Sequence, residues 1–373
     1  MKRKIFISTS NDISTDNRVN KVAVLLEDLG YEVEWIGREM KDSVALHRSY
    51  RARRMKLWNS KGGLFYAEFQ IRLFFELLFR CNRKSMLLSN DLDTLLPNFL
   101  ISRFFGIPLV YDTHEYFCGV PEIQGRWVLR IWRAVEGFIF PRLEHIWTVN
   151  DSIAELYFKD YGIRPKVFRN ISPQPDIQAK SRFELGLPQE VKIAINQGSG
   201  MNIDRGLEEA VEAVSGMEGW LLLLVGSGDA IPKLESLVMQ QGLNEKVRFI
   251  PRVPYSELLQ YTKIADVGLS LDKDTNINYR YSLPNKIFDY IHCNLPVVTS
   301  EVVEVKRIVD NYKIGQTVDP ENLSAIREAL HEVSSKSYES NLKKAQRELN
   351  WEKEQEVLKA FYAQFLLDDC TDA

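Results

Sequence analysis

The chain contains few cysteines, few histidines and almost no excess charge of either sign. Its four cysteines, Cys81, Cys118, Cys293 and Cys370, follow no metal-ligand spacing, which argues against a structural zinc site and against a disulfide framework. We therefore expect buried or free thiols in a reducing cytosol. A net charge of −3 gives the chain no overall electrostatic attraction to nucleic acid, so no nucleic-acid partner is expected.

Long apolar runs are also missing. No stretch reaches the length of a membrane-spanning helix. The apolar residues 5–7 after the basic start are too few for a signal peptide and indicate a first strand. With 373 residues, of which 45% are hydrophobic and 27% charged, the composition is that of a globular protein with two domains. We expect a cytoplasmic location.

Basic residues are concentrated in one segment. Residues 48–61 contain six basic residues and no acidic one, and the aromatic-rich segment 64–79 follows directly. Charges four residues apart form one stripe along the expected helix: Glu68, Arg72, Glu76 and Arg80. This pattern predicts either a peripheral contact with an anionic membrane surface or an ordinary buried helix after a solvated loop. Residues 126–142 repeat the combination of arginine and aromatic residues more weakly.

The first half alternates short apolar strands with helices. A helix over Asn17–Leu29 can be capped by Asp16 or Thr15 and ends at Gly30. Strands are predicted at Lys4–Thr9, Val33–Ile36, Met86–Leu88, Leu109–Tyr111 and His145–Val149. This alternation is typical of an α/β fold whose parallel sheet is covered on both faces.

The second half repeats the alternation after a proline-rich connection at 171–175. Strands are predicted at Ile193–Asn196, Trp220–Val225, Val247–Ile250 and Val267–Leu271, and helices at Gly206–Val214, Pro232–Gln240 and Tyr255–Ile264. The chain is thus expected to form two doubly wound, Rossmann-like domains. Ligands of such sheets bind beyond the carboxyl ends of the strands, and a cleft between two domains is the default site.

Glycines and cations follow several strands of the second half. Gly198, Ser199 and Gly200 follow the first of these strands, and Arg205 comes just before the next helix. Gly226 and Gly228 follow the second strand, and Arg252 with Val253 follows the third. Glycines allow close backbone approach, and a helix N-terminus with nearby cations favours an anion. We expect these loops, together with Lys286, to bind a nucleotide diphosphate, and Arg205 and Lys286 to converge on one pyrophosphate.

The segment from Pro284 to Val298 is the most informative single stretch. On a helix, its polar residues Asn285, Lys286 and Asp289 share one side with Tyr290, and its apolar residues share the other. Lys286 is suited to phosphate charge and Asp289 to a pair of sugar hydroxyls. An ordinary amphipathic helix with a solvated polar side remains the alternative for this stretch taken alone.

Two further patterns involve carboxylates. His114 stands between Asp112 and Glu115 just after a predicted strand, where it would face a nucleotide across the cleft or simply be a hydrogen-bonded loop histidine. Asp91 with Asp93, and Asp272 with Asp274, have the spacing of a pair that chelates a divalent ion. Because a basic diphosphate site needs no metal, we expect no metal site.

Taken together and in this order, the motifs resemble the glycosyltransferases of the GT-B fold, in particular family 4 (group 1 type), over nearly the whole chain. The matching stretches are residues 16–19, 89–91, 111–115, 149–152, 205–207, 225–228 and 284–298. The resemblance implies retaining transfer of a sugar from a UDP- or GDP-type nucleotide sugar to an acceptor hydroxyl, with no other cofactor. It also implies an N-terminal acceptor-binding domain (1–172) and a C-terminal donor-binding domain (173–350). The helix 351–373 would pack back on the first domain through Val357, Leu358, Phe361 and Phe365.

The same resemblance assigns roles to individual residues. Catalytic roles fall on His114, Arg205, Lys286 and Asp289, with Asp289 in the place of the glutamate that holds the ribose. Donor contacts fall on Gly198, Ser199, Gly200, Gly226, Gly228, Arg252, Val253, Arg280, Ser282 and Asn285. Two positions depart from the family pattern: Ser199 replaces a phosphate-binding arginine, and Tyr281 replaces the first glutamate of the motif. Arg280 or Lys286 would then supply the missing charge.

We expect the acceptor to be a carbohydrate or a lipid-linked sugar in cell-surface polysaccharide or glycolipid synthesis. Two alternatives share the architecture. A nucleotide-sugar 2-epimerase would need acid–base carboxylates and histidines in the cleft, and the chain has only five histidines. A catalytically degenerate sugar-nucleotide-binding protein is the second, and the departures at Ser199 and Tyr281 favour it.

Overall fold

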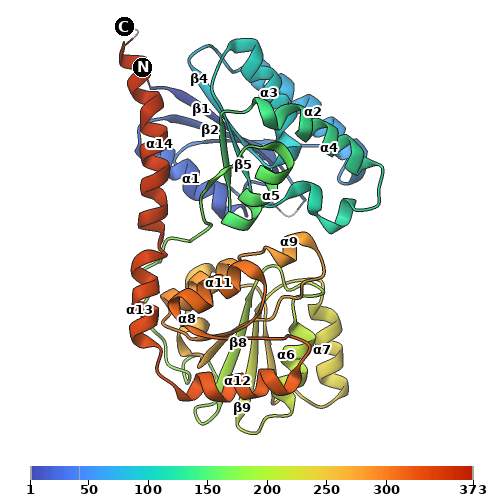
Figure 1. Cartoon of the computed structure of the whole chain (residues 1–373), viewed down its shortest axis with the longest axis vertical. Helices are drawn as coiled ribbons and strands as arrows, with labels where there is room; N and C mark the ends of the chain where they lie inside the picture. Colours follow the sequence, from blue (N-terminus) through green and yellow to red (C-terminus); the bar gives the residue numbers. More distant parts are fainter. Residues whose placement is uncertain (1, 42, 372–373) are drawn as a thin grey trace. The chain divides into compact units, whose positions relative to one another are not determined.

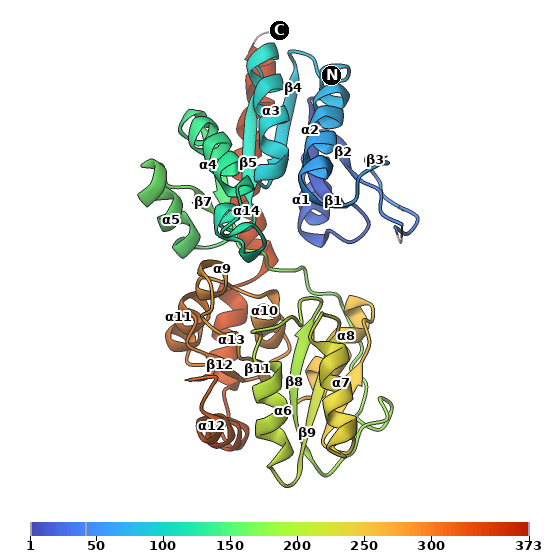
Figure 2. The ribbon, with the colours of Figure 1, turned by 90° about the vertical axis from the view of Figure 1, so that its right-hand side faces the viewer.

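The computed structural model describes residues 2–41 and 43–371, except for the side chains of residues 122 and 367–371. The chain divides into two compact units, residues 1–170 with 354–373 and residues 171–353. The division after Asn170 falls at the start of the proline-rich connection. Figures 1 and 2 show each unit as a sheet covered by helices.

The first unit is built on a seven-stranded parallel sheet in the order β3-β2-β1-β4-β5-β6-β7. Its strands are β1 (Lys4–Asp12), β2 (Glu32–Arg38), β3 (Arg51–Met55), β4 (Ser85–Asn90), β5 (Leu109–Thr113), β6 (His145–Thr148) and β7 (Lys166–Val167). Its helices are α1 (Asn17–Asp28), α2 (Gly62–Leu78), α3 (Leu92–Phe105), α4 (Val128–Ile139), α5 (Asp151–Tyr161) and α14 (Trp351–Thr371), with short 3-10 turns at Phe117–Gly119, Pro121–Ile123 and Phe140–Arg142. Helices α2, α3 and α4 lie on one side of the sheet and α1 and α14 on the other (Figure 1). Every residue of β4 and β5 is buried, as expected for strands covered on both faces.

The C-terminal helix completes the core of the first unit. Its Tyr362 is buried and accepts, through its backbone oxygen, a hydrogen bond of 2.7 Å from the hydroxyl of Tyr31. Phe361 packs edge-on against His145 and Trp147 of β6. The packing of Leu358 and Phe361 agrees with the sequence, whereas Val357 is half exposed. The expectation for Val357 was wrong because Leu358, Phe361 and Tyr362 form the buried side of the helix, which leaves Val357 outside it.

The second unit has a six-stranded parallel sheet in the order β10-β9-β8-β11-β12-β13. Its strands are β8 (Lys192–Gly198), β9 (Trp220–Gly226), β10 (Val247–Ile250), β11 (Val267–Ser270), β12 (Val297–Ser300) and β13 (Gly315–Val318). Its helices are α6 (Leu207–Ser215), α7 (Ile231–Gln240), α8 (Tyr255–Ile264), α9 (Ile277–Arg280), α10 (Asn285–His292), α11 (Val303–Tyr312), α12 (Leu323–Ser335) and α13 (Glu339–Glu348).

Alternate residues of the central strands fill two separate cores. Ala194 of β8 belongs to a core that also contains residues of α6, α7 and α12, whereas Ile193 and Ile195 belong to a core with residues of α8, α10 and α11. The period of two along a strand puts neighbours on opposite faces. Both cores are apolar, and buried polar side chains such as Asn196, Gln197 and Asp272 lie toward the carboxyl ends of the strands.

The basic segment before α2 holds a strand that the sequence did not predict. Strand β3 pairs in parallel with β2 at the edge of the sheet, and Arg53 within it forms an ion pair of 2.7 Å with Glu76 of α2. The i,i+4 pairs Glu68–Arg72 and Glu76–Arg80 are confirmed, at 2.8 Å each. Among the described residues, none of the helices combines the length and the apolarity required to cross a bilayer.

Candidate functional site

The glycine-rich turns after β8 and β9 are fastened to each other through their backbones. The backbone N–H of Ser227 donates to the carbonyl oxygen of Gly198 (3.0 Å), and that of Met201 donates to the oxygen of Ser227 (3.1 Å). A Cβ atom at Gly226 would lie 1.8 Å from the Gly198 oxygen, and one at Gly228 would lie 2.1 Å from the Met201 oxygen. Gly226 and Gly228 are therefore required for the contact between the two turns. The space around Gly200 is open.

Arg205 is fixed at the N-terminal side of α6 by a buried carboxylate. Its Nη1 lies 3.1 Å from Oδ1 of Asp272, which is fully buried at the end of β11. Its guanidinium stacks over the ring of Tyr279, 4.0 Å from the ring centroid. The hydroxyl of Ser270 donates to the other oxygen of Asp272 (3.1 Å). The buried Nε of Arg205 has no hydrogen-bond partner among the described residues, so this cation keeps an unused donor.

Lys286, at the start of α10, shares this environment. Its Nζ donates to Oδ1 of Asn196 at the end of β8 (3.0 Å). Burial lowers the pKa of Lys286 below its usual value; Asp272 opposes this shift and Arg205 adds to it. Arg205 thus pairs with Asp272, and the charges of both act on Lys286. The amide nitrogen of Asn196 is buried and has no hydrogen-bond partner among the described residues.

Asp289, one turn further along α10, is buried and bound on both oxygens. Gln197 of β8 donates to one oxygen (3.0 Å), and the hydroxyl of Tyr255 in α8 donates to the other (2.7 Å). Gln174 in the connection between the units donates to the same hydroxyl (3.3 Å). Burial, and then the charge of Asp289, raise the pKa of Tyr255 well above its usual value, so the hydroxyl stays a donor.

Sequence analysis missed Asn196, Gln197 and Tyr255. The signal for the first two was a pair of amides that ends the otherwise apolar strand β8. Nothing local marked Tyr255, because it is 34 positions from its partner Asp289.

The other expected donor contacts lie further out. Arg280 is half exposed and forms an ion pair with Asp274 (2.9 Å). Val253 packs against a hydrophobic core, and the buried hydroxyl of Ser282 has no hydrogen-bond partner among the described residues. Four further expected contacts are exposed or partly exposed: Gly198, Ser199, Arg252 and Asn285. The structure gathers Arg205, Lys286 and Asp289 around the end of β8, while the nucleotide contacts of this outer group stay a prediction.

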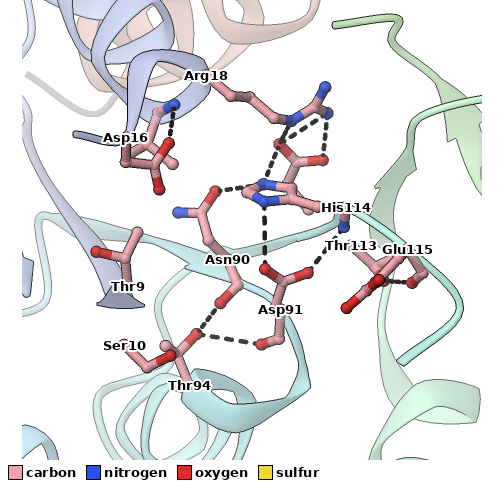
Figure 3. Close-up of polar contacts among 12 residues, drawn as sticks. Thr9, Ser10, Asp16, Arg18, Asn90, Asp91, Thr94, Thr113, His114 and Glu115 are labelled. Atoms are coloured by element: carbon pink, nitrogen blue, oxygen red, sulfur yellow. Dashed lines mark hydrogen bonds and ion pairs between the residues drawn. The ribbon is translucent and has the colours of Figure 1, made fainter. Parts of the chain in front are cut away.

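In the first unit, His114 occupies a cluster of charged side chains at the carboxyl ends of β4 and β5 (Figure 3). Its Nδ1 lies 3.2 Å from Asp91, and its Nε2 lies 3.2 Å from Oδ1 of Asn90 and 3.5 Å from Asp112. Nη2 of Arg18 in α1 donates to both oxygens of Asp112, at 2.8 Å to Oδ1 and 3.1 Å to Oδ2. These contacts give Nδ1 of the imidazole one acceptor and Nε2 two.

His114 is therefore held as an imidazolium. Burial alone would lower the pKa of His114, but the carboxylates of Asp91 and Asp112 outweigh it and raise the pKa to about 10. Burial alone would likewise raise the pKa of Asp112, but Arg18 and then His114 hold it well below its usual range. The ring of His114 is thus a charged donor at neutral pH and is not available as a general base.

The paired carboxylates of the Asp91 and Asp272 motifs are engaged by side chains. Asp91 contacts His114, and Asp93 accepts a short hydrogen bond from Ser10. Burial, and then the charge of Asp91, raise the pKa of Asp93 to about 7. Among the described residues, no group of three or more histidine, cysteine, aspartate or glutamate side chains could hold a metal ion. The expectation of a site without metal stays a prediction.

Comparisons with known proteins agree with this architecture. Residues 177–349 match the family described as glycosyl transferases group 1. No curated protein sequence matches the chain at a significant level.

Solved structures match the chain over nearly its whole length. Sucrose-phosphate synthase from Thermosynechococcus elongatus superposes with a TM-score of 0.82 at 17% identity, covering 98% of this chain and 100% of that one. HepE from Anabaena, in complex with UDP, gives a TM-score of 0.73 at 14% identity over 98% and 100% of the two chains. WaaG, a glycosyltransferase involved in lipopolysaccharide biosynthesis, gives 0.72 at 13% identity over 96% and 99%. The second unit is therefore a group 1 glycosyl transferase domain, and the chain as a whole has the GT-B fold.

Proposed function

We propose that the protein is a retaining glycosyltransferase of the family 4 type, which moves a sugar from a nucleotide diphosphate sugar to an acceptor hydroxyl. The observation that carries this proposal is that Arg205, paired with the buried Asp272, and Lys286 act on each other electrostatically at the strand ends of the group 1 domain. Two cations held near one another in a partly buried site repel each other unless negative charge lies beside them. A diphosphate would add such negative charge.

Stabilisation of the leaving group is then the main catalytic contribution of the second unit. Among the residues that the structure describes, the buried Nε of Arg205 and the amide nitrogen of Asn196 have no acceptor, and an oxyanion would satisfy both. Binding of the diphosphate would also favour the charged form of Lys286, because a nearby anion raises the pKa of an amine. Asp289 would bind the ribose hydroxyls from the position in which Gln197 and Tyr255 hold it.

The protonation of His114 bears on how the acceptor loses its proton. Both ring nitrogens have acceptors in the protein, so His114 would keep both protons, stabilise negative charge through its own positive charge, and not remove a proton. A front-face route, in which the departing phosphate takes the proton of the acceptor, requires no protein base. Retention of configuration follows from that route.

Donor and acceptor classes are proposed from the comparisons. HepE has been solved with UDP and with UDP-glucose, which supports a uridine nucleotide sugar as the first donor to test. WaaG acts in lipopolysaccharide biosynthesis, which supports a carbohydrate or lipid-linked acceptor in cell-surface polysaccharide or glycolipid synthesis. We further propose that the protein works in the cytoplasm, at the inner face of the membrane.

The test is turnover of UDP- and GDP-sugars with sugar acceptors, for the wild type and for Arg205→Ala and Lys286→Ala. Each substitution should lower turnover by about 100-fold or more, because a donor to the developing oxyanion is lost. Lys286→Ala should change the thermal melt little, whereas Arg205→Ala leaves the buried Asp272 unpaired and should also lower the melting temperature. Lys343→Ala on α13, which removes an exposed ion pair with Glu339, is the matched control and should leave turnover unchanged. Unfolding of Lys286→Ala at the assay temperature would assign this cation a structural role, and full turnover by either variant would overturn the proposal.

The alternatives are separated by the same incubation. Formation of an epimer from the nucleotide sugar alone would identify a 2-epimerase, but two of the five histidines, His145 and His331, pack against aromatic rings. Binding of the nucleotide without transfer or hydrolysis of any donor would identify a degenerate binding protein. The anomeric configuration of the product, read by NMR, tests retention.

A further inference from the structure

Helices α3 and α4 of the first unit expose five large apolar side chains. These are Leu100, Phe104, Trp127, Ile131 and Phe138, and each is between 46% and 72% exposed. In the helical repeat, Trp127, Ile131 and Phe138 follow one another at intervals of four and seven, so they form a single stripe. Leu100 and Phe104 are likewise four residues apart on α3. Isolated exposed apolar residues are common, but two adjacent stripes are not.

The two stripes meet. Phe138 of α4 packs edge-on against Phe99 of α3 with 6.2 Å between ring centroids. Arg103 of α3 donates to the backbone oxygen of Arg142, just beyond α4 (2.8 Å). Both helices also lie on the same side of the sheet (Figure 1). We call this surface, defined by the five apolar residues above, the α3–α4 face.

The charge of the α3–α4 face has one sign. Five exposed arginines lie on these two helices or next to the ends of α4: Arg103, Arg126, Arg130, Arg133 and Arg142. Within residues 92–105 and 126–142, all of which the structure describes, the only carboxylates are Asp93 and Glu136, and both are buried. The nearest exposed acid along the chain after α4 is Glu144. The surface therefore combines apolar side chains with an excess of positive charge.

Helix α2 differs in charge. It also exposes large apolar side chains (Leu64, Ile71, Phe75 and, at its end, Phe79), but glutamates neutralise its arginines in the pairs Glu68–Arg72 and Glu76–Arg80. The basic segment before α2 also forms an ion pair with Glu76 through Arg53. Residues 126–142 are therefore the better candidate for a membrane contact, whereas the sequence pattern favoured residues 48–79.

We propose that the α3–α4 face docks on an anionic lipid bilayer. Tryptophan and phenylalanine insert at the boundary between headgroups and acyl chains, while arginines reach the phosphates of the headgroups. The guanidinium of Arg142 lies over the ring of Phe138, 4.1 Å from its centroid, so a cation and an apolar surface are presented together. The excess of arginines matches a negatively charged bilayer better than the mixed charges of an average protein surface. This inference rests on the first unit alone and does not depend on the transfer activity.

The experiment is co-sedimentation of the full chain with phosphatidylcholine vesicles that contain or lack phosphatidylglycerol. The wild type should sediment only with the anionic vesicles, and added salt should release it. Ile131→Glu, and separately the double charge reversal Arg130→Glu with Arg133→Glu, should each weaken partitioning about tenfold or more. Met239→Glu on α7, which replaces an exposed apolar side chain of the other unit, should have no effect.

Three results would overturn the proposal. One is a wild type that stays in solution with anionic vesicles. Another is a Met239→Glu variant that loses as much binding as Ile131→Glu. The third is a wild-type dimer in sedimentation velocity that becomes a monomer in Ile131→Glu, because the face would then bind a second copy of the chain. Circular dichroism melts of each variant establish that a loss of binding is not a loss of folding.

Discussion

The charge on His114 can be tested directly, because the structure predicts an unusual pH dependence. In an unfolded chain a histidine loses its proton near pH 6.5, whereas the carboxylates of Asp91 and Asp112 hold the proton of His114 to about pH 10. A shift of this size corresponds to at most about 5 kcal/mol of folding free energy at 1.36 kcal/mol per unit. The side chain is 21% exposed, so solvent screening makes about half of that a realistic value.

The sign follows from proton linkage. Because the folded-state pKa of His114 is raised, its contribution to the free energy of unfolding is fully present below about pH 6.5. The contribution is lost as the pH rises toward about 10. Urea unfolding at several pH values should therefore show a steeper fall between pH 7 and 10 in the wild type than in His114→Gln. The difference between the two proteins cancels the titration of other groups.

NMR of the histidine side chains measures the protonation itself. The ring nitrogens of His114 should show the charged form through neutral pH. His145 serves as an internal control, because burial lowers its pKa below the usual value and it should titrate on the other side of 6.5. A His114 ring that becomes neutral near pH 6.5 would refute the reasoning and would restore this residue as a candidate general base.

Two further predictions concern the second unit. Gly226→Ala should lower the free energy of unfolding by about 3 kcal/mol or more, since its Cβ would lie 1.8 Å from the Gly198 oxygen at a φ of +143°. Gly200→Ala is the control, because the space around Gly200 is open, and it should leave the thermal melt almost unchanged. Equal effects of the two substitutions would contradict the role assigned to the turn contact. Tyr255→Phe removes the donor to Asp289 and should weaken UDP binding by about fivefold in calorimetry, at a cost of about 1 kcal/mol in stability. Tighter UDP binding by that variant would mean that the hydroxyl occupies the place of the ribose.

Helices and strands marked by neighbouring residues, such as an N-cap or an apolar repeat, could be predicted from the sequence. The observed bounds of β10 and α8 are those expected, and α1 starts at Asn17 with Asp16 as its N-cap, which accepts from the N–H of Val19 (3.0 Å). Strand β3 could not be predicted, because its arginine-rich sequence has no apolar pattern and the strand depends on pairing with the edge of β2.

The candidate site divides in the same way. Lys286 and Asp289 were identified because one helical turn sets their spacing. The charge state of His114 could not be, since its partners come from β4, β5 and the turn between β4 and α3, and only tertiary packing unites them. Asp272 was considered as a metal ligand, whereas its observed partner is Arg205. The pairing of Asp272 with Arg205 depends on tertiary structure, because the two residues are far apart in the sequence.

The last residues of the chain belong to the unit that is synthesised first. Residues 1–170 lack the buried side chains of Leu358, Phe361 and Tyr362 until the whole of residues 171–353 has been made. On the ribosome, the second unit can therefore complete its core before the first one can. A fragment that ends at residue 170 should be a poor folding unit, whereas residues 171–353 form a contiguous segment suited to separate expression.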